Sequence, residues 1–515
     1  MAPVPATELF SLDLADEAAT VRLAEDLAAL LSAGDLIALS GNLGAGKSTF
    51  ARALLRAFAA NSTLEVPSPT FTLVQTYDLP RLTVSHLDLY RLDDPEELLE
   101  LGLDELVATG AALVEWPEKA GHLLPSGALF LTFSAGHDDD GRHVVFSARE
   151  AETASRWGAR LERTIAIRSL MHAAGWGQAS RRYLIGDAAA RTYERLHFDG
   201  ASAIVMNAPP LYVLAGPGET PSYGEIVHRA RTIAPFLALT TELRRRGYAA
   251  PEILAADEDR CLIVLEDLGS DTMVHERAPI PERYEAAALL LADMHASAPW
   301  SETLPVPGGG SYTIPAYSRR ALLTEADLFL DWYVPWRAGV PVSPDFVPAD
   351  VREEYHALWH KALDDIAHAE TGWVLRDYHS PNIIWREQRH GVDRLGLIDY
   401  QDCVIGPLAY DVSSLALDAR VDMPHELERH LVDLYVTARR TVDTRFDPEP
   451  FHAAYAVTAA QRVAKILGLF IRLNLREGKP GYMAHLPRMA GYLDRALAHP
   501  VLADLNHWFH KRIGG

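Results

Sequence analysis

The sequence predicts two domains of different fold class. The first is an α/β P-loop domain with a mostly parallel sheet over residues 1–150, and the second is an α+β domain of two lobes over residues 160–515. Two patterns predict them: a glycine-rich loop from Gly41 to Ser48, and an aspartate–asparagine–aspartate series that follows Leu375. The length of 515 residues also favours more than one domain.

The loop from Gly41 to Ser48 reads GNLGAGKS, the pattern of a phosphate-binding loop. Asp35 to Ser40 before it is typical of a buried parallel strand, and Thr49 to Ala60 after it has helical spacing. Glycines let the backbone turn its N–H groups toward an anion at a helix N-terminus. Lys47 then reaches the outer phosphates, and the Ser48 hydroxyl binds Mg²⁺. The predicted nucleotide-binding residues of the loop are Gly41, Asn42, Leu43, Gly44, Ala45, Gly46, Lys47, Ser48 and Thr49.

Two acidic residues lie at the ends of predicted strands after this loop. Asp88 follows the apolar run from Val84 to Leu87, and Glu115 ends the run that begins at Ala111. Mg²⁺ on a nucleotide needs a carboxylate beyond the loop serine, so Asp88 is a predicted Mg²⁺ ligand. Glu115 is predicted to orient an attacking water. The alternative for each is a solvated acid at the end of a strand.

Three further segments carry a family resemblance: VPSPTFTLVQTYD, HLDLYRLDDPEELLELGLDE and LVEWPEKA. Together with the phosphate loop they resemble TsaE, the small bacterial ATPase of tRNA threonylcarbamoyladenosine biosynthesis, over residues 8–148. The resemblance implies ATP binding between this domain and a TsaB–TsaD complex, with hydrolysis supporting repeated turnover of the tRNA modification.

The resemblance also implies roles for single residues. Lys47 and Ser48 hold phosphates and Mg²⁺, and Asp88 is the acid on the Mg²⁺ side. Thr70 lies in the segment that senses the nucleotide, and Glu115 with Trp116 forms an acid–tryptophan pair near it. Asn42 stands where aspartate is common, and we expect little effect from this change. The alternative for Trp116 is core or interface packing.

The chain is acidic. Its first 150 residues carry 9 Lys and Arg against 23 Asp and Glu, a net charge of −14 out of −22 for the whole chain. Nucleic-acid backbones are bound through lysine and arginine, so we expect tRNA to be reached only indirectly, through protein partners. The alternative is that the acidity serves solubility alone.

We expect a cytoplasmic protein that does not bind a membrane. The N-terminal residues show no signal-peptide pattern, and no uninterrupted apolar run approaches the length of a membrane span. The two cysteines, Cys261 and Cys403, are far apart in the sequence and indicate reduced core thiols instead of a disulfide or a metal site.

The second domain carries a phosphotransfer pattern. After a boundary in the polar segment from Glu150 to Trp157, we expect lobes over about residues 180–270 and 271–510. A kinase-type site needs a base for the acceptor hydroxyl, an asparagine for Mg²⁺ and a second aspartate for Mg²⁺. Asp377 is the predicted catalytic base, with Asn382 and Asp399 as Mg²⁺ ligands. The alternative is a plain surface loop.

Further segments of this domain resemble known kinases. YLIGDAAARTYERL, which contains Gly186, Asp187 and Arg191, resembles the nucleotide-covering hairpin of an aminoglycoside-phosphotransferase-like kinase. CLIVLEDLG, which contains Glu266, resembles the hinge strand where adenine is held. The resemblance implies an α+β bilobal, protein-kinase-like fold. IDYQDCVIGPLAYDVSSL and QRVAKILGLFIRLNLREGKPGYMAHLPR are most similar to AmgK, the anomeric kinase of N-acetylmuramate and N-acetylglucosamine in cell-wall recycling, over about residues 165–500.

Two features depart from the kinase pattern. Leu375 replaces the usual histidine before the catalytic loop, a position that is mainly structural. No lysine occurs between residues 119 and 361, so the N-lobe lacks the lysine that grips phosphates, and Met206 and Asn207 occupy about that region. We hypothesise that Arg191 binds the nucleotide phosphates instead. The alternatives are a solvated hairpin arginine, and a weak kinase or pseudokinase.

The acceptor is predicted to be a small amino sugar whose hydroxyl loses its proton to Asp377. Asp411 is predicted to brace the catalytic loop through backbone hydrogen bonds, and His379 to be a packed loop residue. The predicted lining of the sugar pocket is Asp402, Tyr410 and Gln461.

These patterns predict a bifunctional enzyme that uses ATP and Mg²⁺. Its partners are TsaB- and TsaD-like proteins for the first domain and an amino sugar for the second. Three alternatives stay open: the second domain is a non-catalytic regulatory module, the first domain only docks to TsaD-like partners, or the acceptor is an aminoglycoside.

Overall fold

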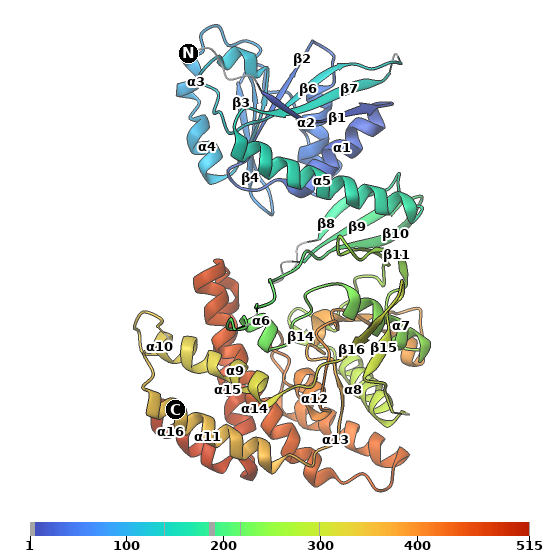
Figure 1. Cartoon of the computed structure of the whole chain (residues 1–515), viewed down its shortest axis with the longest axis vertical. Helices are drawn as coiled ribbons and strands as arrows, with labels where there is room; N and C mark the ends of the chain where they lie inside the picture. The colour runs from blue at the N-terminus through green and yellow to red at the C-terminus, as the bar shows by residue number, and fades with distance from the viewer. Residues whose placement is uncertain are drawn as a thin grey trace. The chain divides into compact units, whose positions relative to one another are not determined.

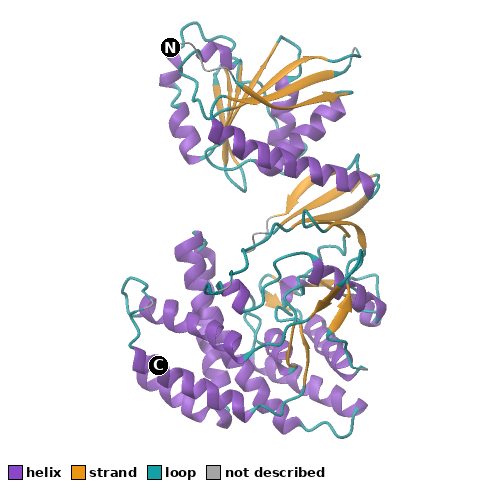
Figure 2. Ribbon diagram, in the orientation of Figure 1, coloured by secondary structure: helices purple, strands orange, loops and turns teal. Residues whose placement is uncertain are grey.

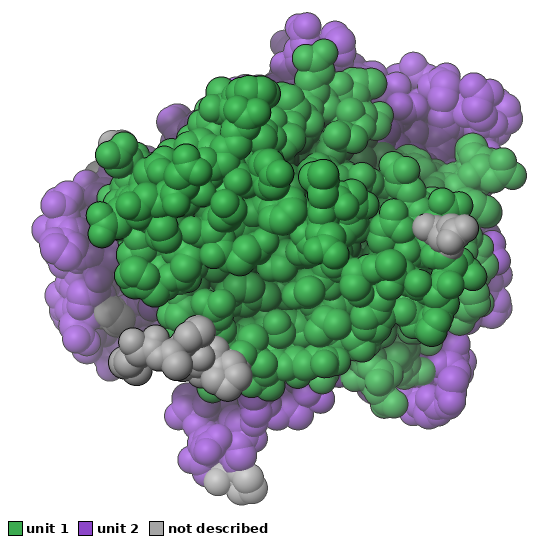
Figure 3. All heavy atoms as spheres, turned by 90° about the horizontal axis from the view of Figure 1, so that it is seen from above, with its two compact units in different colours: residues 1–207, 254–267 green, residues 208–253, 268–515 purple. Residues whose placement is uncertain are grey.

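The computed structural model describes residues 6–138, 140–184, 191–216, 218–297, 299–343 and 345–513. The chain forms two compact units, coloured separately in Figure 3. Unit 1 comprises Met1–Asn207 and Leu254–Asp267, and unit 2 comprises Ala208–Ile253 and Leu268–Gly515. The chain therefore passes from unit 1 to unit 2 for the last time between Asp267 and Leu268, within the segment that resembles a hinge strand.

Unit 1 begins with a seven-stranded sheet in the order β1-β7-β6-β2-β5-β4-β3 (Figure 1). Its strands are β1 (Thr7–Leu14), β2 (Leu36–Gly41), β3 (Val74–Asp78), β4 (Thr83–Asp88), β5 (Ala111–Glu115), β6 (Leu129–Ala135) and β7 (Arg142–Ala148). The central strands β4, β5, β2 and β6 are parallel. Antiparallel pairs extend both edges, β3 on β4 and β7 with β1 on β6. The sheet is therefore mixed, and "mostly parallel" describes only its centre, because short turns join β3 to β4 and β6 to β7.

Helices cover both faces of this sheet. On β2, Ile37 and Leu39 pack on one face with α1 (Glu17–Leu30) and α2 (Lys47–Phe58). Leu36 and Ala38 pack on the other face with α3 (Glu97–Glu100), α4 (Leu103–Thr109) and the 3₁₀ turn η1 (Pro117–Ala120). A central parallel strand buried on both faces explains why this run is apolar throughout.

One helix, α5 (Ala151–Ala173), serves two cores of unit 1. Trp157 and Leu161 in its first half belong to a core on one face of the seven-stranded sheet. Ile167 and Met171 in its second half pack under a second sheet in the order β11-β12-β10-β9-β8 (Figure 1). The strands of that sheet are β8 (Ser180–Leu184), β9 (Thr192–Phe198), β10 (Ala201–Asn207), β11 (Ile253–Asp257) and β12 (Leu262–Glu266).

A buried ionic cluster also joins helix α1 of the first domain to this second sheet. The Arg181 guanidinium on β8 donates to Asp26 Oδ1 on α1 at 2.6 Å and to both oxygens of Glu194 on β9 at 2.6 and 2.8 Å. The Arg181 side chain is 1% exposed. Burial opposes its charge, but the two carboxylates raise its pKa. Arg168 on α5 also donates to Asp26. The two sheets of unit 1 are therefore joined by desolvated ion pairs as well as by α5.

Unit 2 is mainly helical, with short two-stranded ladders (Figure 2). Its helices are α6 (Tyr223–Ile226), α7 (Ala234–Arg245), α8 (Pro281–Ala296), α9 (Arg319–Leu328), α10 (Val334–Arg337), α11 (Ala349–Asp365), α12 (Ala409–Ala416), α13 (His425–Val442), α14 (Pro448–Glu477), α15 (Leu486–Leu497) and α16 (Ala503–Ile513), with the π-helical segment η2 (Phe329–Tyr333) and the 3₁₀ turns η3 (Ser380–Asn382), η4 (Gly391–Arg394), η5 (Pro480–His485) and η6 (Pro500–Leu502). Its strands are β13 (Val274–His275), β14 (Ala278–Pro279), β15 (Thr303–Pro305), β16 (Ser311–Thr313), β17 (Thr371–Val374), β18 (Ile383–Trp385), β19 (Leu395–Leu397) and β20 (Val404–Pro407). β17 pairs with β20, and β18 pairs with β19. These two ladders hold the segment around Asp377.

The long helix α14 forms the core of unit 2. By length and composition it could cross a membrane, but 83% of its most apolar window is buried inside the structure. Gly468 allows α14 to approach the end of α9, because a Cβ there would lie 1.9 Å from the Leu328 carbonyl oxygen. These contacts identify α14 as a core helix. Cys261 and Cys403 are both buried and free, as predicted.

We predict that the R181A variant loosens unit 1 as a whole. Removing one partner of a buried ion pair leaves Asp26 and Glu194 desolvated without their cation, which costs about 3–5 kcal/mol. Hydrogen exchange should show lost protection in α1 and β9 alike. The matched control is R182A, which removes the exposed arginine next in sequence. Equal protection in R181A and R182A would contradict the structural role of the cluster.

Candidate nucleotide and phosphotransfer sites

The phosphate loop joins the end of β2 to the start of α2. Gly41, Gly44 and Gly46 have φ angles of +138°, +78° and +109°, in the region that favours glycine. At Gly41 a Cβ would also lie 2.5 Å from the Phe133 carbonyl oxygen on β6. The glycines of the motif are therefore required by the backbone conformation itself.

Lys47 packs against the predicted acid–tryptophan pair. Its Nζ donates to the carbonyl oxygens of Gly41 at 2.7 Å and Asn42 at 3.0 Å. The same Nζ lies 3.7 Å from the centre of the Trp116 indole ring, a cation–π contact. Burial lowers the pKa of Lys47, and nearby carboxylates, with Glu115 first among them, oppose that shift. The ammonium group is thus held at the loop beside Trp116.

The predicted acids lie next to the loop serine. Asp88 and Glu115 are paired residues on the parallel strands β4 and β5. Glu115 Oε2 accepts a hydrogen bond from Ser48 Oγ at 2.8 Å. Asp88 Oδ2 accepts from Ser68 Oγ at 2.7 Å and Thr70 Oγ1 at 2.6 Å. The structure therefore brings Ser48, Thr70, Asp88, Glu115 and Trp116 together at one edge of the sheet.

Sequence reasoning missed His86. Its Nε2 lies 3.0 Å from Glu115 Oε1, and both side chains are 1% exposed. The contact fixes the Glu115 carboxylate between His86 on one side and Ser48 on the other. The signal was present in the motif HLDLYR, since residues two apart on a strand face the same side and His86 precedes Asp88 by two.

In unit 2, Asp411 on α12 fixes the start of the catalytic loop. Its two carboxylate oxygens accept from the backbone N–H groups of Leu375 at 2.6 Å and Arg376 at 2.9 Å, which confirms the predicted brace. Burial raises the pKa of Asp411 to about 7, and the two N–H donors oppose that shift. Arg376 has a φ angle of +68°, so these hydrogen bonds hold the loop in a conformation that a non-glycine residue rarely adopts.

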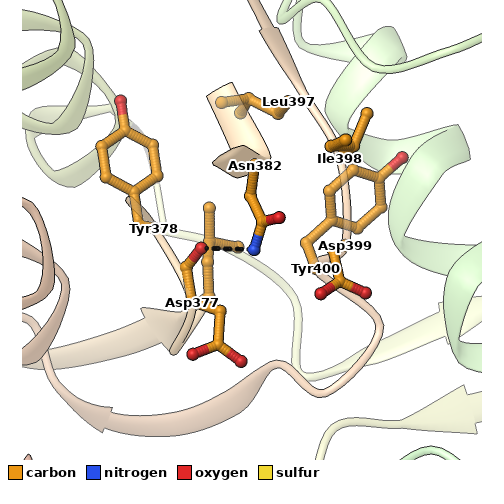
Figure 4. Close-up of a pocket in the computed structure, with 8 residues that line it drawn as sticks. Asp377, Tyr378, Asn382, Leu397, Ile398, Asp399 and Tyr400 are labelled. Atoms are coloured by element: carbon orange, nitrogen blue, oxygen red, sulfur yellow. Dashed lines mark hydrogen bonds between the residues drawn. The ribbon is translucent and has the colours of Figure 1, made fainter. Parts of the chain in front are cut away.

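The three predicted phosphotransfer residues line one small hollow (Figure 4). Asp377 lies on the loop after β17, Asn382 precedes β18, and Asp399 follows β19. Asn382 Nδ2 donates to the Asp377 carbonyl oxygen at 2.9 Å, and the Asp377 carboxylate points away from that amide (Figure 4). Asp399 has a left-handed φ angle of +59°. Loops from two ladders thus bring together residues that are up to 22 positions apart in the sequence.

The Asp377 carboxylate is ionised at neutral pH. Its side chain is 46% exposed. Burial opposes its charge, but the surrounding His379, Lys465, Arg462 and Arg376 lower the pKa of the carboxyl well below its usual range. Burial also lowers the pKa of His379 to about 4, so this buried histidine is neutral at pH 7. The arginines and Lys465 are therefore the cations that keep Asp377 a base at neutral pH.

A buried ionic cluster that sequence reasoning missed lies behind this loop. Glu325 on α9 is 0% exposed. It pairs with Arg376, accepts from the Tyr317 hydroxyl, and lies 2.8 Å from Lys465 Nζ on α14. Arg376 immediately precedes Asp377, so its pairing with Glu325 fixes the start of the loop that carries Asp377.

The predicted sugar-pocket residues make contacts within the protein. Gln461 and Tyr410 are both buried, and Gln461 Nε2 donates to the Leu322 carbonyl oxygen at 2.9 Å. Asp402 accepts from the Ala230 backbone N–H at 2.7 Å. None of the three lines the hollow at Asp377, and their place in an acceptor pocket stays a prediction.

The predicted nucleotide residues of the second sheet are partly described. Gly186 and Asp187 lie outside the described residues. Arg191 is buried just before β9, and Glu266 ends β12. Asn207 ends β10, in the region where the sequence lacks the phosphate-binding lysine of most kinases. Its Oδ1 accepts a hydrogen bond from Arg163 at 2.9 Å.

Among residues 6–138, 140–184, 191–216, 218–297, 299–343 and 345–513, no group of three or more His, Cys, Asp or Glu side chains could hold a metal ion. Mg²⁺ does not require such a group, because it is commonly held by one or two carboxylates together with substrate phosphates and water. Ser48 with Asp88, and Asn382 with Asp399, fit that mode of binding.

Family models match both parts of the chain. The model described as threonylcarbamoyl adenosine biosynthesis protein TsaE matches residues 14–144. The model described as phosphotransferase enzyme family matches residues 120–453.

Individual relatives agree with these two matches. An N-acetylmuramate/N-acetylglucosamine kinase of Caulobacter vibrioides is 35% identical over 68% of this chain and 97% of that protein. The corresponding kinase of Pseudomonas aeruginosa is 30% identical over 65% of this chain and 90% of that protein. A tRNA threonylcarbamoyladenosine biosynthesis protein TsaE of Rickettsia bellii is 40% identical over 24% of this chain and 87% of that protein.

We predict that ATP with Mg²⁺ changes the fluorescence of Trp116. A phosphate in the loop attracts Lys47 Nζ away from the indole ring and from the loop carbonyls. The change should saturate with ATP concentration and disappear in W116F and in K47A. An identical signal in wild type and W116F would show that Lys47 and Trp116 do not report on the loop.

Proposed function

We propose that this chain, which belongs to the TsaE family and to the phosphotransferase enzyme family, carries two ATP-dependent activities. The N-terminal domain is an ATPase that supports threonylcarbamoyladenosine modification of tRNA. The C-terminal domain is a kinase that transfers phosphate to an amino sugar, N-acetylmuramate or N-acetylglucosamine, at the anomeric hydroxyl. The observation that carries the kinase assignment is the meeting of Asp377, Asn382 and Asp399 around one hollow.

In the N-terminal domain the residues fit the steps of ATP hydrolysis. The loop N–H groups and Lys47 bind the phosphates, and Ser48 with Asp88 would hold Mg²⁺, which offsets phosphate charge when bound. Thr70, bonded to Asp88, links the segment before β3 to that acid. Glu115, fixed by His86 and Ser48, is the group that orients the attacking water.

This activity depends on other proteins. We propose TsaB- and TsaD-like proteins as its partners, with tRNA reached through them, since the domain carries a net charge of −14. The alternative, a domain that only docks to these partners, would support tRNA modification without the phosphate contacts of Lys47.

In the C-terminal domain Asp377 accepts the proton of the sugar hydroxyl as that oxygen attacks the terminal phosphorus of ATP. Asn382 and Asp399 would hold Mg²⁺, which neutralises charge on the transferred phosphoryl group when bound. Asp411 holds the loop through the N–H groups of Leu375 and Arg376, so that Asp377 keeps its position. We further propose that the backbone around Glu266 takes the adenine and that Arg191 contributes the missing cation.

The alternative of a non-catalytic regulatory module is disfavoured by the relatives of this domain. Those that align over most of it are named as kinases of N-acetylmuramate and N-acetylglucosamine.

We predict that D377N loses sugar phosphorylation by about 10²- to 10⁴-fold, because the base is removed while its shape is kept. ATP binding should persist. The measurement is transfer of labelled phosphate from ATP to N-acetylmuramate and N-acetylglucosamine by the full chain. The matched control D393N changes a carboxylate that pairs with Arg386, away from the hollow. Transfer by D377N at the wild-type rate would exclude Asp377 as the base.

We predict that K47A abolishes support of tRNA modification and leaves sugar phosphorylation intact. The measurement is the threonylcarbamoyladenosine content of tRNA in a strain whose only TsaE activity comes from this chain. The matched control K119A removes a lysine that donates to the Leu92 carbonyl oxygen, outside the loop. Full modification with K47A would show that the N-terminal domain only docks to its partners.

A further inference from the structure

A second pocket of unit 2 shares no lining residue with the hollow at Asp377. Its wall comes from the residues before β17, the start of α12, the second half of α13, the loop after α13 and the first turns of α14. Its volume is about 240 Å³. A cavity of about 150 Å³ is enough for a benzene-sized molecule. The pocket therefore has room for one ring with a short substituent.

The aromatic residues Tyr435, Phe446 and Phe451 line this pocket. The rings of Tyr435 and Phe451 stack with their centres 4.9 Å apart, and the ring centres of Phe446 and Phe451 are 5.9 Å apart. Leu408 and Ala454, both buried, add apolar surface. This lining suits a flat apolar ring, which gains from burial and from contact with aromatic side chains.

The charged side chains that line the pocket are mostly acidic. Glu370, Asp443 and Asp447 supply three carboxylates, whereas Arg439 supplies one guanidinium and His368 an imidazole. Arg439 Nη2 donates to the two oxygens of Glu370 at 2.8 and 2.9 Å. These two charges therefore compensate each other, which leaves the carboxylates of Asp443 and Asp447.

Asp443 and Asp447 receive little compensation from cations of the protein. Asp443 pairs with Arg445, whose side chain is 88% exposed, and exposed ion pairs are weak. Asp447 is the N-cap of α14 and accepts from the Glu449 backbone N–H at 3.1 Å, but it makes no ion pair with another described residue. The pocket therefore attracts a cationic ligand and repels an anionic one.

Arg439 adds a hydrogen-bond donor to the wall. It is 4% exposed, and its guanidinium lies 4.9 Å from the centre of the Phe446 ring. Its Nη1 donates to the Tyr435 hydroxyl at 2.9 Å, whereas its Nε is buried without an acceptor among the described residues. Buried donors are nearly always bonded, so this wall is completed by an acceptor from outside the chain.

The pocket is connected to the catalytic loop through β17 and α12. Glu370 lies directly before β17, and its carbonyl oxygen accepts from the Leu408 N–H at 3.0 Å. Ala409, which lines the pocket, begins α12. Asp411 follows it by two positions and holds the first two N–H groups of the catalytic loop. A ligand in the pocket therefore contacts the helix that fixes this loop.

We propose that this pocket binds a small aromatic amino alcohol, and that its occupant stabilises α12 and the catalytic loop. The ring packs on Phe446 and Phe451. The ammonium group lies near Asp443 and Asp447, and the hydroxyl oxygen accepts from Arg439. Because the ligand contacts α12, α13 and α14 at once, it favours the folded state of these helices. Binding at this site does not depend on the proposed kinase function.

The test compares probes of different charge by calorimetry on the full chain. The probes are 2-amino-1-phenylethanol, 1-phenylethane-1,2-diol and mandelate, which share the ring and the hydroxyl beside it. The amine should bind about 5- to 30-fold more tightly than the neutral diol, because its ammonium group adds an ion pair and a cation–π contact. Mandelate should bind more weakly than the diol. Equal affinities for amine and diol, or no binding of the amine, would overturn the proposal.

A variant locates the amine at the pocket. D447N removes one carboxylate and keeps the cap of α14, because asparagine is also a favourable N-cap. It should lower the affinity for the amine by about 3-fold and leave that for the diol unchanged. The matched control is D16N, which makes the same change at the N-cap of α1. Unchanged affinity in D447N, or an equal loss in D16N, would contradict the assignment to this pocket.

Hydrogen exchange measures the connection to the catalytic loop without any phosphate transfer. With the amine at ten times its Kd, exchange of the Leu375 and Arg376 N–H groups should slow by up to about 10-fold. Exchange in β4 of unit 1 should not change. In F446A, which loses part of the aromatic lining, the amine at the same concentration should have a smaller effect. Exchange at Leu375 and Arg376 that is the same with and without bound amine would overturn the proposed stabilisation of the loop.

Discussion

Unit 1 and unit 2 each contain a cluster of buried charged side chains, and the structure of each unit depends on these charges being paired. Arg181 is nearly fully buried, and Asp26 and Glu194, which contact it, offset the loss of its hydration. Glu325 is buried to the same degree and is balanced by Arg376 and Lys465. Taking ions out of water is costly, so each cluster fixes the elements that supply its members. The first cluster joins two sheets, and the second supports a catalytic loop.

Two residues around the predicted phosphotransfer site have unusual backbone conformations. Arg376 and Asp399 both have positive φ angles, which are unfavourable for side-chain-bearing residues. Asp411 offsets this at the start of the loop by accepting two backbone N–H groups. Strain of this kind persists where the surroundings over-determine the conformation. The surroundings here are the ladders β17–β20 and β18–β19, which hold both ends of the segment.

Features encoded by neighbouring residues could be predicted from the sequence, and features made by distant pairs could not. The loop from Gly41 to Ser48 and the series around Asp377 are short motifs with a defined chemistry, and the Asp411 brace follows from where a carboxylate must lie to hold such a loop. Glu325, which contacts residues 51 and 140 positions away, leaves no local pattern.

The two domains predicted from the sequence share a helix, because α5 contributes side chains to the cores of both sheets of unit 1. Composition placed a boundary near Glu150 to Trp157, yet α5 runs unbroken through that segment and contributes Trp157 to one core and Ile167 to the next. Neither core is complete without its half of this helix. A ligand that binds only the folded state stabilises every part that unfolds with its site. ATP in the phosphate loop therefore stabilises the second sheet as well, to the extent that α5 and the Arg181 cluster make unit 1 fold as one body.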